Sequence, residues 1–218
     1  QLACLEHAYL VYGPVRFDLN QNKHSHYGWM RDQRYVLLLR KWRAQVHPLV
    51  QRTTVSAIVL YCTREGGGVS HARRIPRTHE EDIVHTLRQK LAAGPKLITA
   101  QLKIFIGVKD GRAMPVAQQA QLFRSATLVV GPHGSALANI LWLEDASKMG
   151  AKPQVLEFVC GARSIDVQSG CPYTRTYWYY YGMAQWVDYH FVVFAANSSR
   201  HATYINLTEF VSALNTIL

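Results

Sequence analysis

The residues that most directly indicate chemistry form a short glycine-rich segment, Gly131-Pro132-His133-Gly134-Ser135. It follows an apolar run and precedes a predicted helix over residues 135–142. Glycine lets a backbone approach a ligand closely, and the start of a helix presents N–H groups without intrahelical partners to an anion. His133, at the apex of this loop, can hydrogen-bond a phosphate oxygen or act as an acid or base. The same residues fit a structural turn in which His133 caps the helix, so the loop alone leaves both interpretations open.

Two further segments place charge where a nucleotide would need it. Guanidinium groups bind diphosphates in a bidentate manner, and three of them surround the glycines at positions 66–68, namely Arg64, Arg73 and Arg74. Glu157 lies in a later apolar segment, where α/β nucleotide sites commonly use an acid to accept both hydroxyls of a ribose. Each has a plain structural alternative, because the arginines also fit a solvated basic loop and Glu157 a buried acid paired with an arginine.

The elements that must position these residues alternate along the chain. Apolar strands are predicted over residues 55–61, 102–106, 127–130, 154–158 and 190–194. Helices are predicted from a capping box at Thr78 and Glu81, from Pro115, over residues 135–142 and over residues 207–218. Alternating strands and helices imply βαβ units, and hence a Rossmann-like α/β fold with a parallel sheet covered by helices on both faces. Ligands of such sheets bind outside the carboxyl ends of the strands, which is where the three charged or glycine-rich segments fall.

Length and charge restrict the classes of protein. The 218 residues suffice for a sizeable core, and we expect a Rossmann-like domain over residues 55–218 after a connecting segment, residues 1–54, with a basic amphipathic helix over 30–46. The net charge of +10 lies entirely within residues 1–112, which hold 18 basic and 8 acidic residues (18 − 8 = +10). The aromatic block at 177–181 lies in the neutral remainder, so basic and aromatic residues are not interleaved and a nucleic-acid partner is not expected.

The ordered motifs resemble the C-terminal half of the catalytic region of glycosyltransferase family 61. The resemblance extends from about Val55 to Leu214 and rests on IVLYCTR, ARRI, QLFRSATLVVGPHGSALANILWL and VLEF. The third motif is similar to a family loop Gly-Pro-His-Gly-Ala-Gly-Leu-Thr-Asn, with matches at Gly131, Pro132, His133, Gly134, Leu137 and Asn139. This chain differs where Ala136 replaces the second loop glycine, Ala138 the threonine, and Arg77 an asparagine.

The resemblance implies an inverting GT-B glycosyltransferase that moves a sugar from a nucleotide sugar, usually a UDP-sugar, to a hydroxyl of a glycan or protein. The substrate-binding residues that it implies are Arg64, Arg73, Arg74, Gly131, His133, Gly134, Ser135, Asn139 and Glu157. The arginines and the loop would contact the diphosphate, His133 a phosphate or the sugar, and Glu157 the ribose. No metal cofactor is expected, because GT-B enzymes neutralise the leaving diphosphate with basic side chains and a helix N-terminus, and the sequence has no D-x-D.

The catalytic base has no candidate in this sequence. In this architecture it commonly comes from an N-terminal domain, so we expect the chain to be incomplete for activity. A non-catalytic relative that binds a nucleotide sugar or a partner protein is the main alternative. A serine hydrolase using Ser135 is a further one, although its surroundings lack the G-x-S-x-G pattern.

Features outside the loops bear on the compartment. Asn197 and Asn206 begin N-glycosylation sequons, which are used in a secretory lumen. Together with the resemblance they indicate the lumen of the Golgi or endoplasmic reticulum, as part of a type II membrane or secretory protein whose anchor would precede this chain. The apolar runs are too short to span a bilayer. Cys160 and Cys171 are close enough in sequence to close a short disulfide loop, but spacing alone does not establish one.

Overall fold

The computed structural model describes residues 41, 43–45, 57–63, 75–93, 100–109, 111–144, 149–160, 187–194 and 204–218. The chain divides into two compact units, residues 1–49 and residues 50–218. In the first unit, residues 41 and 43–45 are helical, within the basic helix predicted for residues 30–46. All other described residues belong to the second unit.

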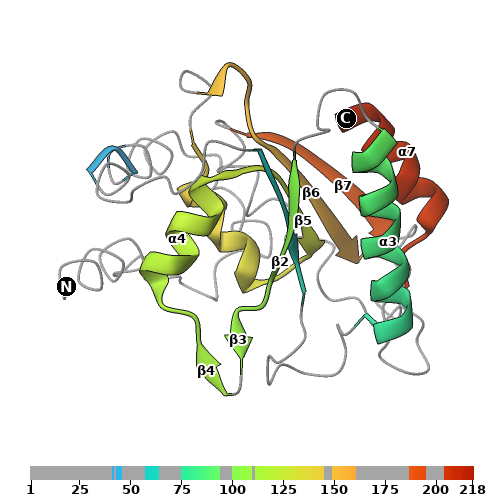
Figure 1. Ribbon diagram of the computed structural model, residues 1–218, viewed down its shortest axis with the longest axis horizontal. Helices are drawn as coiled ribbons and strands as arrows, with labels where there is room; N and C mark the ends of the chain where they lie inside the picture. Colours follow the sequence, from blue (N-terminus) through green and yellow to red (C-terminus); the bar gives the residue numbers. More distant parts are fainter. Residues whose placement is uncertain are drawn as a thin grey trace, which may run out of the picture. The chain divides into compact units, whose positions relative to one another are not determined.

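The second unit is built on a parallel five-stranded sheet (Figure 1). Its strands, in chain order, are β1 (Ile58–Cys62), β2 (Gln101–Phe105), β5 (Ala126–Pro132), β6 (Gln154–Cys160) and β7 (Asp188–Phe194). They lie in the order β2-β1-β5-β6-β7, and every neighbouring pair is parallel. A short hairpin of β3 (Val108–Lys109) and β4 (Arg112–Ala113) follows β2 and turns through Gly111, whose φ of +71° favours glycine. The parallel α/β prediction is confirmed.

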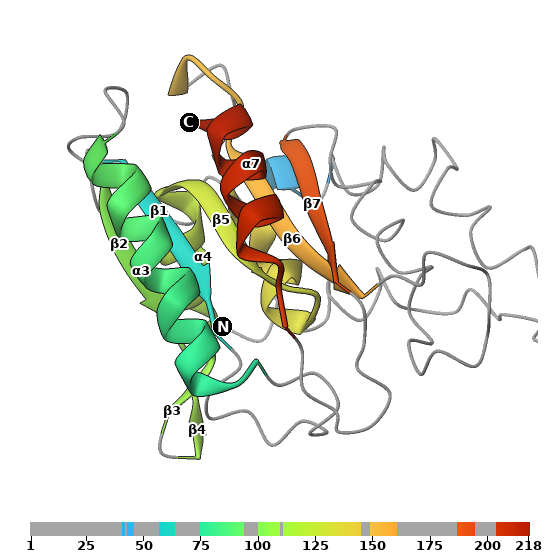
Figure 2. The same ribbon diagram turned by 90° about the vertical axis from the view of Figure 1, so that its right-hand side faces the viewer.

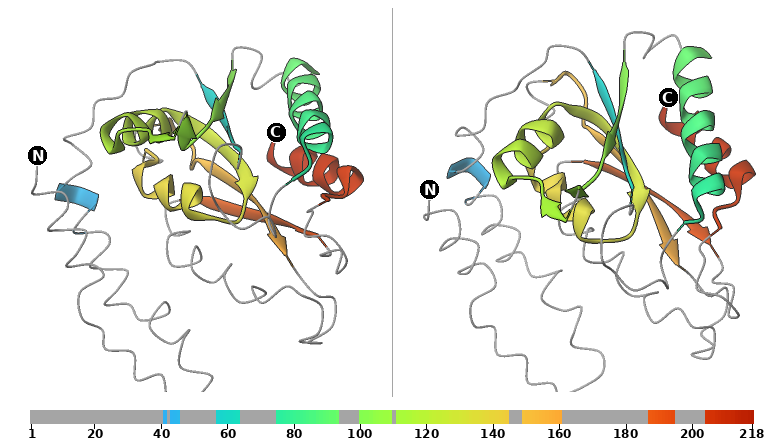
Figure 3. Two further views of the ribbon diagram at one scale, coloured as in Figure 1. Left: turned by 90° about the horizontal axis from the view of Figure 1, so that it is seen from below. Right: turned by 60° about the horizontal axis from the view of Figure 1, so that its bottom comes forward.

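Helices cover both faces of the sheet, as predicted. They are α3 (Arg77–Ala93), α4 (Val116–Arg124), the 3-10 helix η5 (Ser135–Trp142) and α7 (Leu207–Ile217). α3 and α7 lie together over one face, while α4 and η5 lie over the other (Figures 2 and 3). Parallel strands buried on both faces account for the near-continuous apolar runs of β1 and β5.

The core beneath α3 and α7 is almost wholly apolar. Alternate residues of the strands point to this face and pack against the two helices; they are Val59, Tyr61, Leu128, Val130, Leu156, Phe158 and Val192. Ile83 and Leu87 from α3 and Phe210 and Leu214 from α7 complete the cluster. On the opposite face Phe105 of β2 meets Phe123 of α4 edge to face, with ring centroids 5.1 Å apart.

Three local predictions need correction. The capping box at Thr78 and Glu81 is wrong, because α3 already begins at Arg77 and the N–H of Glu80 donates to the carbonyl of Pro76 at 2.9 Å. Proline has no N–H to satisfy, which suits the start of a helix. The helix over residues 135–142 is a 3-10 helix, and β5 extends through residues 131 and 132, which were predicted as loop. Pairing with β6 explains the longer strand, since both residues have partners there.

The direction in which strands are added reverses between β1 and β5. After β1 the chain adds β2 on one side, then returns and adds β5, β6 and β7 in sequence on the other side. This is the order of a doubly wound sheet, in which ligands bind in the crevice at the reversal. The carboxyl ends of β1 and β5 therefore define the place to look for a site.

Candidate functional site

The ends of β1 and β5 approach each other closely at Gly131. A Cβ atom added at Gly131 would lie 2.8 Å from the Cβ of Cys62 and 2.9 Å from its carbonyl oxygen. Both distances are shorter than side chains tolerate, so only glycine lets the two strands meet here. Gly131 thus admits the neighbouring strand, and its contact with a ligand stays a prediction. β5 ends one residue later, at Pro132, directly before His133.

His133 is held in place by both its backbone and its ring. Its N–H donates to the carbonyl of Phe158 on β6 at 2.9 Å. Its Nδ1 lies 2.5 Å from Oε1 of Glu157, and the hydroxyl of Tyr189 on β7 donates to Oε2 of the same carboxylate. We call His133, Glu157 and Tyr189 the switch-point cluster. β6, β7 and the residue that follows β5 thus contribute one side chain each to a single hydrogen-bonded chain.

Burial makes this cluster energetically significant. Glu157 is fully buried, whereas the side chain of His133 is 18% exposed. A buried carboxylate costs several kcal/mol unless each oxygen has a partner, and here both oxygens have one. The sequence analysis left open a purely structural interpretation in which a buried Glu157 pairs with an arginine. In the structure the partner is a histidine, His133. The arrangement anchors the imidazole through Nδ1 and leaves its exposed part at the end of β5.

The structure brings together some of the predicted site residues. His133 and Glu157 are in direct contact, and Gly134 and Ser135 begin η5 beside them. Asn139 instead ties η5 to α4, because its Nδ2 donates to Oε1 of Gln119 at 2.9 Å and to the carbonyl of Ala136 at 3.1 Å. Ligand contacts of Asn139 and Glu157 stay predictions.

Several predicted residues lie outside the described part of the chain. They are Arg64, Arg73 and Arg74 of the basic loop, Cys171, and the sequon residue Asn197. The second sequon residue, Asn206, is described and exposed. Its Oδ1 accepts the N–H groups of Thr208 and Glu209, at 2.9 and 3.3 Å, and so caps α7.

Tyr189 is the member of the cluster that the sequence did not reveal. It lies one residue before the predicted strand over residues 190–194. Its contact with Glu157 depends on the register of β7 against β6, in which Tyr189 pairs with Val155. The long connection between these strands does not encode that register, so no local signal marked the residue.

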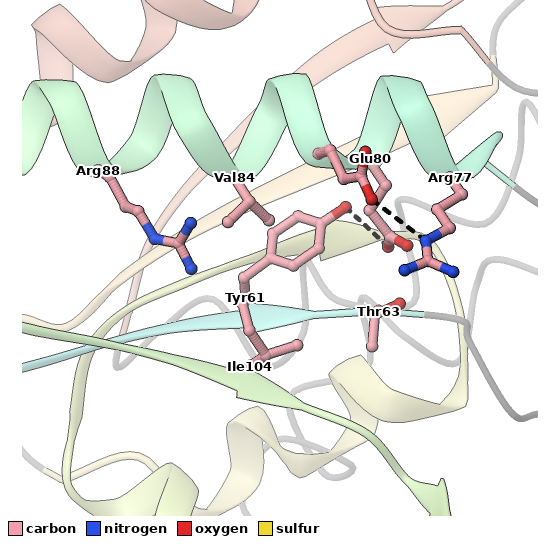
Figure 4. A pocket seen from close by; sticks show the side chains of 8 residues that line it. Tyr61, Thr63, Arg77, Glu80, Val84, Arg88 and Ile104 are labelled. Atoms are coloured by element: carbon pink, nitrogen blue, oxygen red, sulfur yellow. Dashed lines mark hydrogen bonds and ion pairs between the residues drawn. The ribbon is translucent and has the colours of Figure 1, made fainter.

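A hollow lies beside α3 (Figure 4). It has a volume of about 240 Å³, with Tyr61 between Arg77 and Arg88. The Tyr61 hydroxyl donates to Oε1 of Glu80 at 3.1 Å, and burial, followed by the charge of Glu80, raises the pKa of Tyr61 well above its ordinary value. Arg77 Nε pairs with Glu81 at 3.1 Å, with both side chains exposed. The hollow therefore carries mixed charge, unlike a dedicated diphosphate site.

Among the described residues, no group of three or more His, Cys, Asp or Glu side chains is placed to hold a metal ion. Within the same part of the chain, no helix combines the length and apolar character needed to cross a bilayer.

The fold and the switch-point cluster define a doubly wound α/β protein with a polar site at the reversal of strand order. The sequence model of the family Glycosyltransferase 61 matches residues 15–150, more than half of the chain, and the chain belongs to this family. The match includes the His133 loop and ends before Glu157, whereas the motifs had indicated a resemblance from about Val55 to Leu214. No curated protein matches the chain. Family membership supports glycosyl transfer, from a nucleotide sugar to a glycan acceptor.

Proposed function

We propose that this chain binds a UDP-sugar at the carboxyl ends of β1, β5 and β6, as the donor-binding domain of an inverting GT-B glycosyltransferase. The observation that carries the proposal is the placement of His133. It follows β5 at the reversal of strand order, where doubly wound sheets bind nucleotides, and a buried carboxylate holds its ring. The nucleotide class is further supported by membership of the family.

The reaction needs positive charge at the leaving group. The acceptor hydroxyl oxygen attacks the anomeric carbon from the face opposite the diphosphate, the bond from this carbon to the diphosphate oxygen breaks, and the configuration inverts. The hydroxyl proton passes to a base, which we expect outside the described residues, and the nucleoside diphosphate leaves as an anion. In the proposal, His133, the first N–H groups of η5 and the arginines at 64, 73 and 74 stabilise that anion without a metal ion.

The compartment and acceptor form the second part of the proposal. A sequon at the exposed Asn206 fits exposure to a secretory lumen, and we place the enzyme in the Golgi or endoplasmic reticulum, acting on a glycan or glycoprotein. The glycan would attach to Nδ2, while Oδ1 caps α7. The two roles of Asn206 therefore use different atoms and are compatible.

Nucleotide-dependent stabilisation tests the site. A ligand that binds only the folded chain raises its melting temperature, so we expect UDP at millimolar concentration to raise Tm more than CDP or GDP. His133→Ala should abolish the rise. His85→Ala is the matched control, since His85 is exposed on α3, on the other face of the sheet, and the rise should persist. A Tm that no nucleotide or nucleotide sugar changes would contradict the proposal.

Turnover separates the enzyme from its main alternative. With a UDP-sugar and an acceptor glycan, release of UDP together with a product of inverted configuration supports the transferase. Binding of UDP with no release of sugar by the full-length protein would favour a non-catalytic relative, a reading that the replacements Ala136 and Ala138 in η5 make worth testing.

A further inference from the structure

Two side-chain amides link the segment that follows β2 to the first turn of η5. Nε2 of Gln119, near the start of α4, donates to the carbonyl of Met114 at 2.7 Å, and Oε1 of Gln119 accepts from Nδ2 of Asn139 at 2.9 Å. Nδ2 of Asn139 also donates to the carbonyl of Ala136, at 3.1 Å. We call Gln119 and Asn139 the amide relay. At each end the relay contacts a backbone carbonyl.

The two backbone carbonyls fix the direction of both amides. A carbonyl oxygen only accepts hydrogen bonds, so the NH₂ group of each amide must face the carbonyl beside it. Gln119 therefore turns its oxygen toward Asn139, and Asn139 turns its NH₂ group toward Gln119. Turning either amide over would place two acceptors against each other. The relay therefore has one arrangement in which every contact is favourable.

The amide relay joins the two sides of the reversal of strand order. Met114 follows the β3–β4 hairpin, and its N–H donates to the carbonyl of Gly107, just beyond β2, at 2.9 Å. Ala136 lies in the first turn of η5, which follows β5. β2 and β5 are the two neighbours of β1, so the relay connects segments that follow the strands on either side of β1. The proposed diphosphate site lies at this reversal.

Other contacts hold the body and the far end of η5. Leu137 and Ile140 are fully buried. Nε of Arg124, the last residue of α4, pairs with Oε2 of Glu144 beyond the end of η5 at 3.0 Å, and both side chains are buried. The relay acts at the first turn, where the N–H groups proposed to face the ligand are found. Groups that bind a ligand must be held to within about 0.5 Å, so a contact at this turn bears directly on affinity.

We infer that Gln119 and Asn139 are positioning residues: the amide relay holds the first turn of η5 so that its N–H groups face the nucleoside diphosphate at the carboxyl end of β5. This inference rests on the proposed function, and it gives Asn139 a role other than contact with the substrate. It also adds Gln119 to the residues on which donor binding depends. Binding then depends on the bond between the two amides, and not on either side chain by itself.

A double-mutant cycle on UDP affinity tests the relay. Isothermal titration calorimetry of the full chain gives Kd for the wild type, Gln119→Ala, Asn139→Ala and the double variant at one pH. Each single substitution breaks the same bond, so each should weaken UDP binding by about three- to tenfold, the typical contribution of one neutral hydrogen bond. The double variant should bind no more weakly than either single variant, because the effects of two residues joined by one bond do not add.

An asparagine on the other face of the sheet provides the matched control. Oδ1 of Asn215 accepts from Nζ of Lys90 at 2.7 Å and so joins α7 to α3 (Figure 2). Asn215→Ala therefore also removes a side-chain bond between two helices, and its Kd for UDP should equal that of the wild type. Circular dichroism and Tm establish that each variant is folded. Gln119→Met, which keeps most of the length of the side chain without its polar atoms, supplies the cycle if Gln119→Ala does not fold.

Each outcome decides between the hypotheses. If only Asn139→Ala weakens UDP binding, Asn139 contacts the ligand, and the positioning role is wrong while the donor site stands. If both single variants lower Tm and leave Kd unchanged, the relay serves stability alone, which also overturns the inference. Losses that add in the double variant would mean that the two side chains act separately. If the wild type does not bind UDP, both the inference and the proposed donor site are wrong.

Discussion

Two histidine-containing clusters join β6 to its neighbours, and they differ mainly in burial. The switch-point cluster surrounds the fully buried Glu157. The second, which we call the amino-end cluster, lies at the start of β6 and β7 and consists of Lys152, Gln154, Asp188 and His190. Gln154 connects it, because its Oε1 accepts from Nε2 of His190 at 2.9 Å and its Nε2 donates to Oδ2 of Asp188 at 3.0 Å.

The comparison shows that burial within the sheet changes how much similar polar contacts contribute to the free energy of unfolding. Asp188 is 50% exposed and Lys152 46% exposed, so water can replace either partner. Water does not reach Glu157 to replace a partner, since this residue is fully buried. We therefore expect the switch-point cluster to dominate stability and function, and the amino-end cluster to contribute little.

Removing the buried carboxylate should have the largest effect. Glu157→Ala leaves the ring of His133 and the hydroxyl of Tyr189 without the acid that both contact. Breaking a buried pair in this way costs about 3 to 5 kcal/mol of unfolding free energy. Urea denaturation measures the loss, and a change below about 1 kcal/mol would show that the buried cluster is no more important than an exposed one.

The backbone contact beside the cluster comes next. Gly131→Ala pushes a methyl group into Cys62, and overpacking of this kind costs about 1 to 3 kcal/mol. Gly107→Ala is the matched control, because its added Cβ would lie 3.6 Å from the ring of Phe105, an ordinary contact distance. Equal unfolding free energies for the two variants would mean that β1 and β5 separate easily at their ends.

Alkaline pH tests two buried groups of β1 that are neutral at ordinary pH, the thiol of Cys62 and the hydroxyl of Tyr61. Burial raises the pKa of both Cys62 and Tyr61, so these groups keep their protons in the folded chain when the unfolded chain has already lost them. Stability is therefore full below the ordinary pKa values and falls above about pH 9, by up to ~1.4 kcal/mol per pH unit for each group. Urea titrations from pH 8 to pH 10.5 measure the slope, which Cys62→Ala should reduce. A slope unchanged by that substitution would assign the loss to other groups.

Replacing Asn206, the exposed residue that caps the start of α7, should have an intermediate effect on the free energy of unfolding. Asn206→Ala removes the acceptor for two N–H groups at the start of α7 and should cost about 1 kcal/mol. Asn206→Asp keeps the acceptor, and Thr208→Ala keeps Asn206 while removing the sequon, so both should retain the cap. Equal thermal destabilisation by alanine and aspartate at position 206 would contradict the capping role.

The amino-end cluster should respond least. Asp188→Ala breaks a contact with Lys152 at 3.8 Å and one with Gln154, both at exposed side chains. The expected change in unfolding free energy is within about 0.5 kcal/mol and should shrink further in high salt. A loss comparable to that of Glu157→Ala would remove the distinction between the two clusters.

Much of the fold was predictable, because its signals are local. Short apolar runs bounded by glycine or proline marked β1, β2, β5, β6 and β7 to within a few residues, and the spacing of apolar side chains marked α3, α4 and α7. The 3-10 form of η5 was not foreseen, because the sequence over residues 135–142 satisfies helical spacing of either type. The loop containing His133 and the acid at position 157 were both predicted to contribute site residues, from their types and their places after or within strands, and the structure shows that the two side chains are in contact.

What the sequence determined by itself is the alternation of strands and helices, and hence a parallel α/β sheet with a glycine-rich loop at a strand end. Only the tertiary structure decided which side chains meet there. Glu157 is 24 residues from His133 and 32 from Tyr189, and the register of three parallel strands brings them into one hydrogen-bonded chain. Register is set by the packing of the whole sheet and both helix layers, and a pattern of neighbouring residues carries no information about a partner so far along the chain.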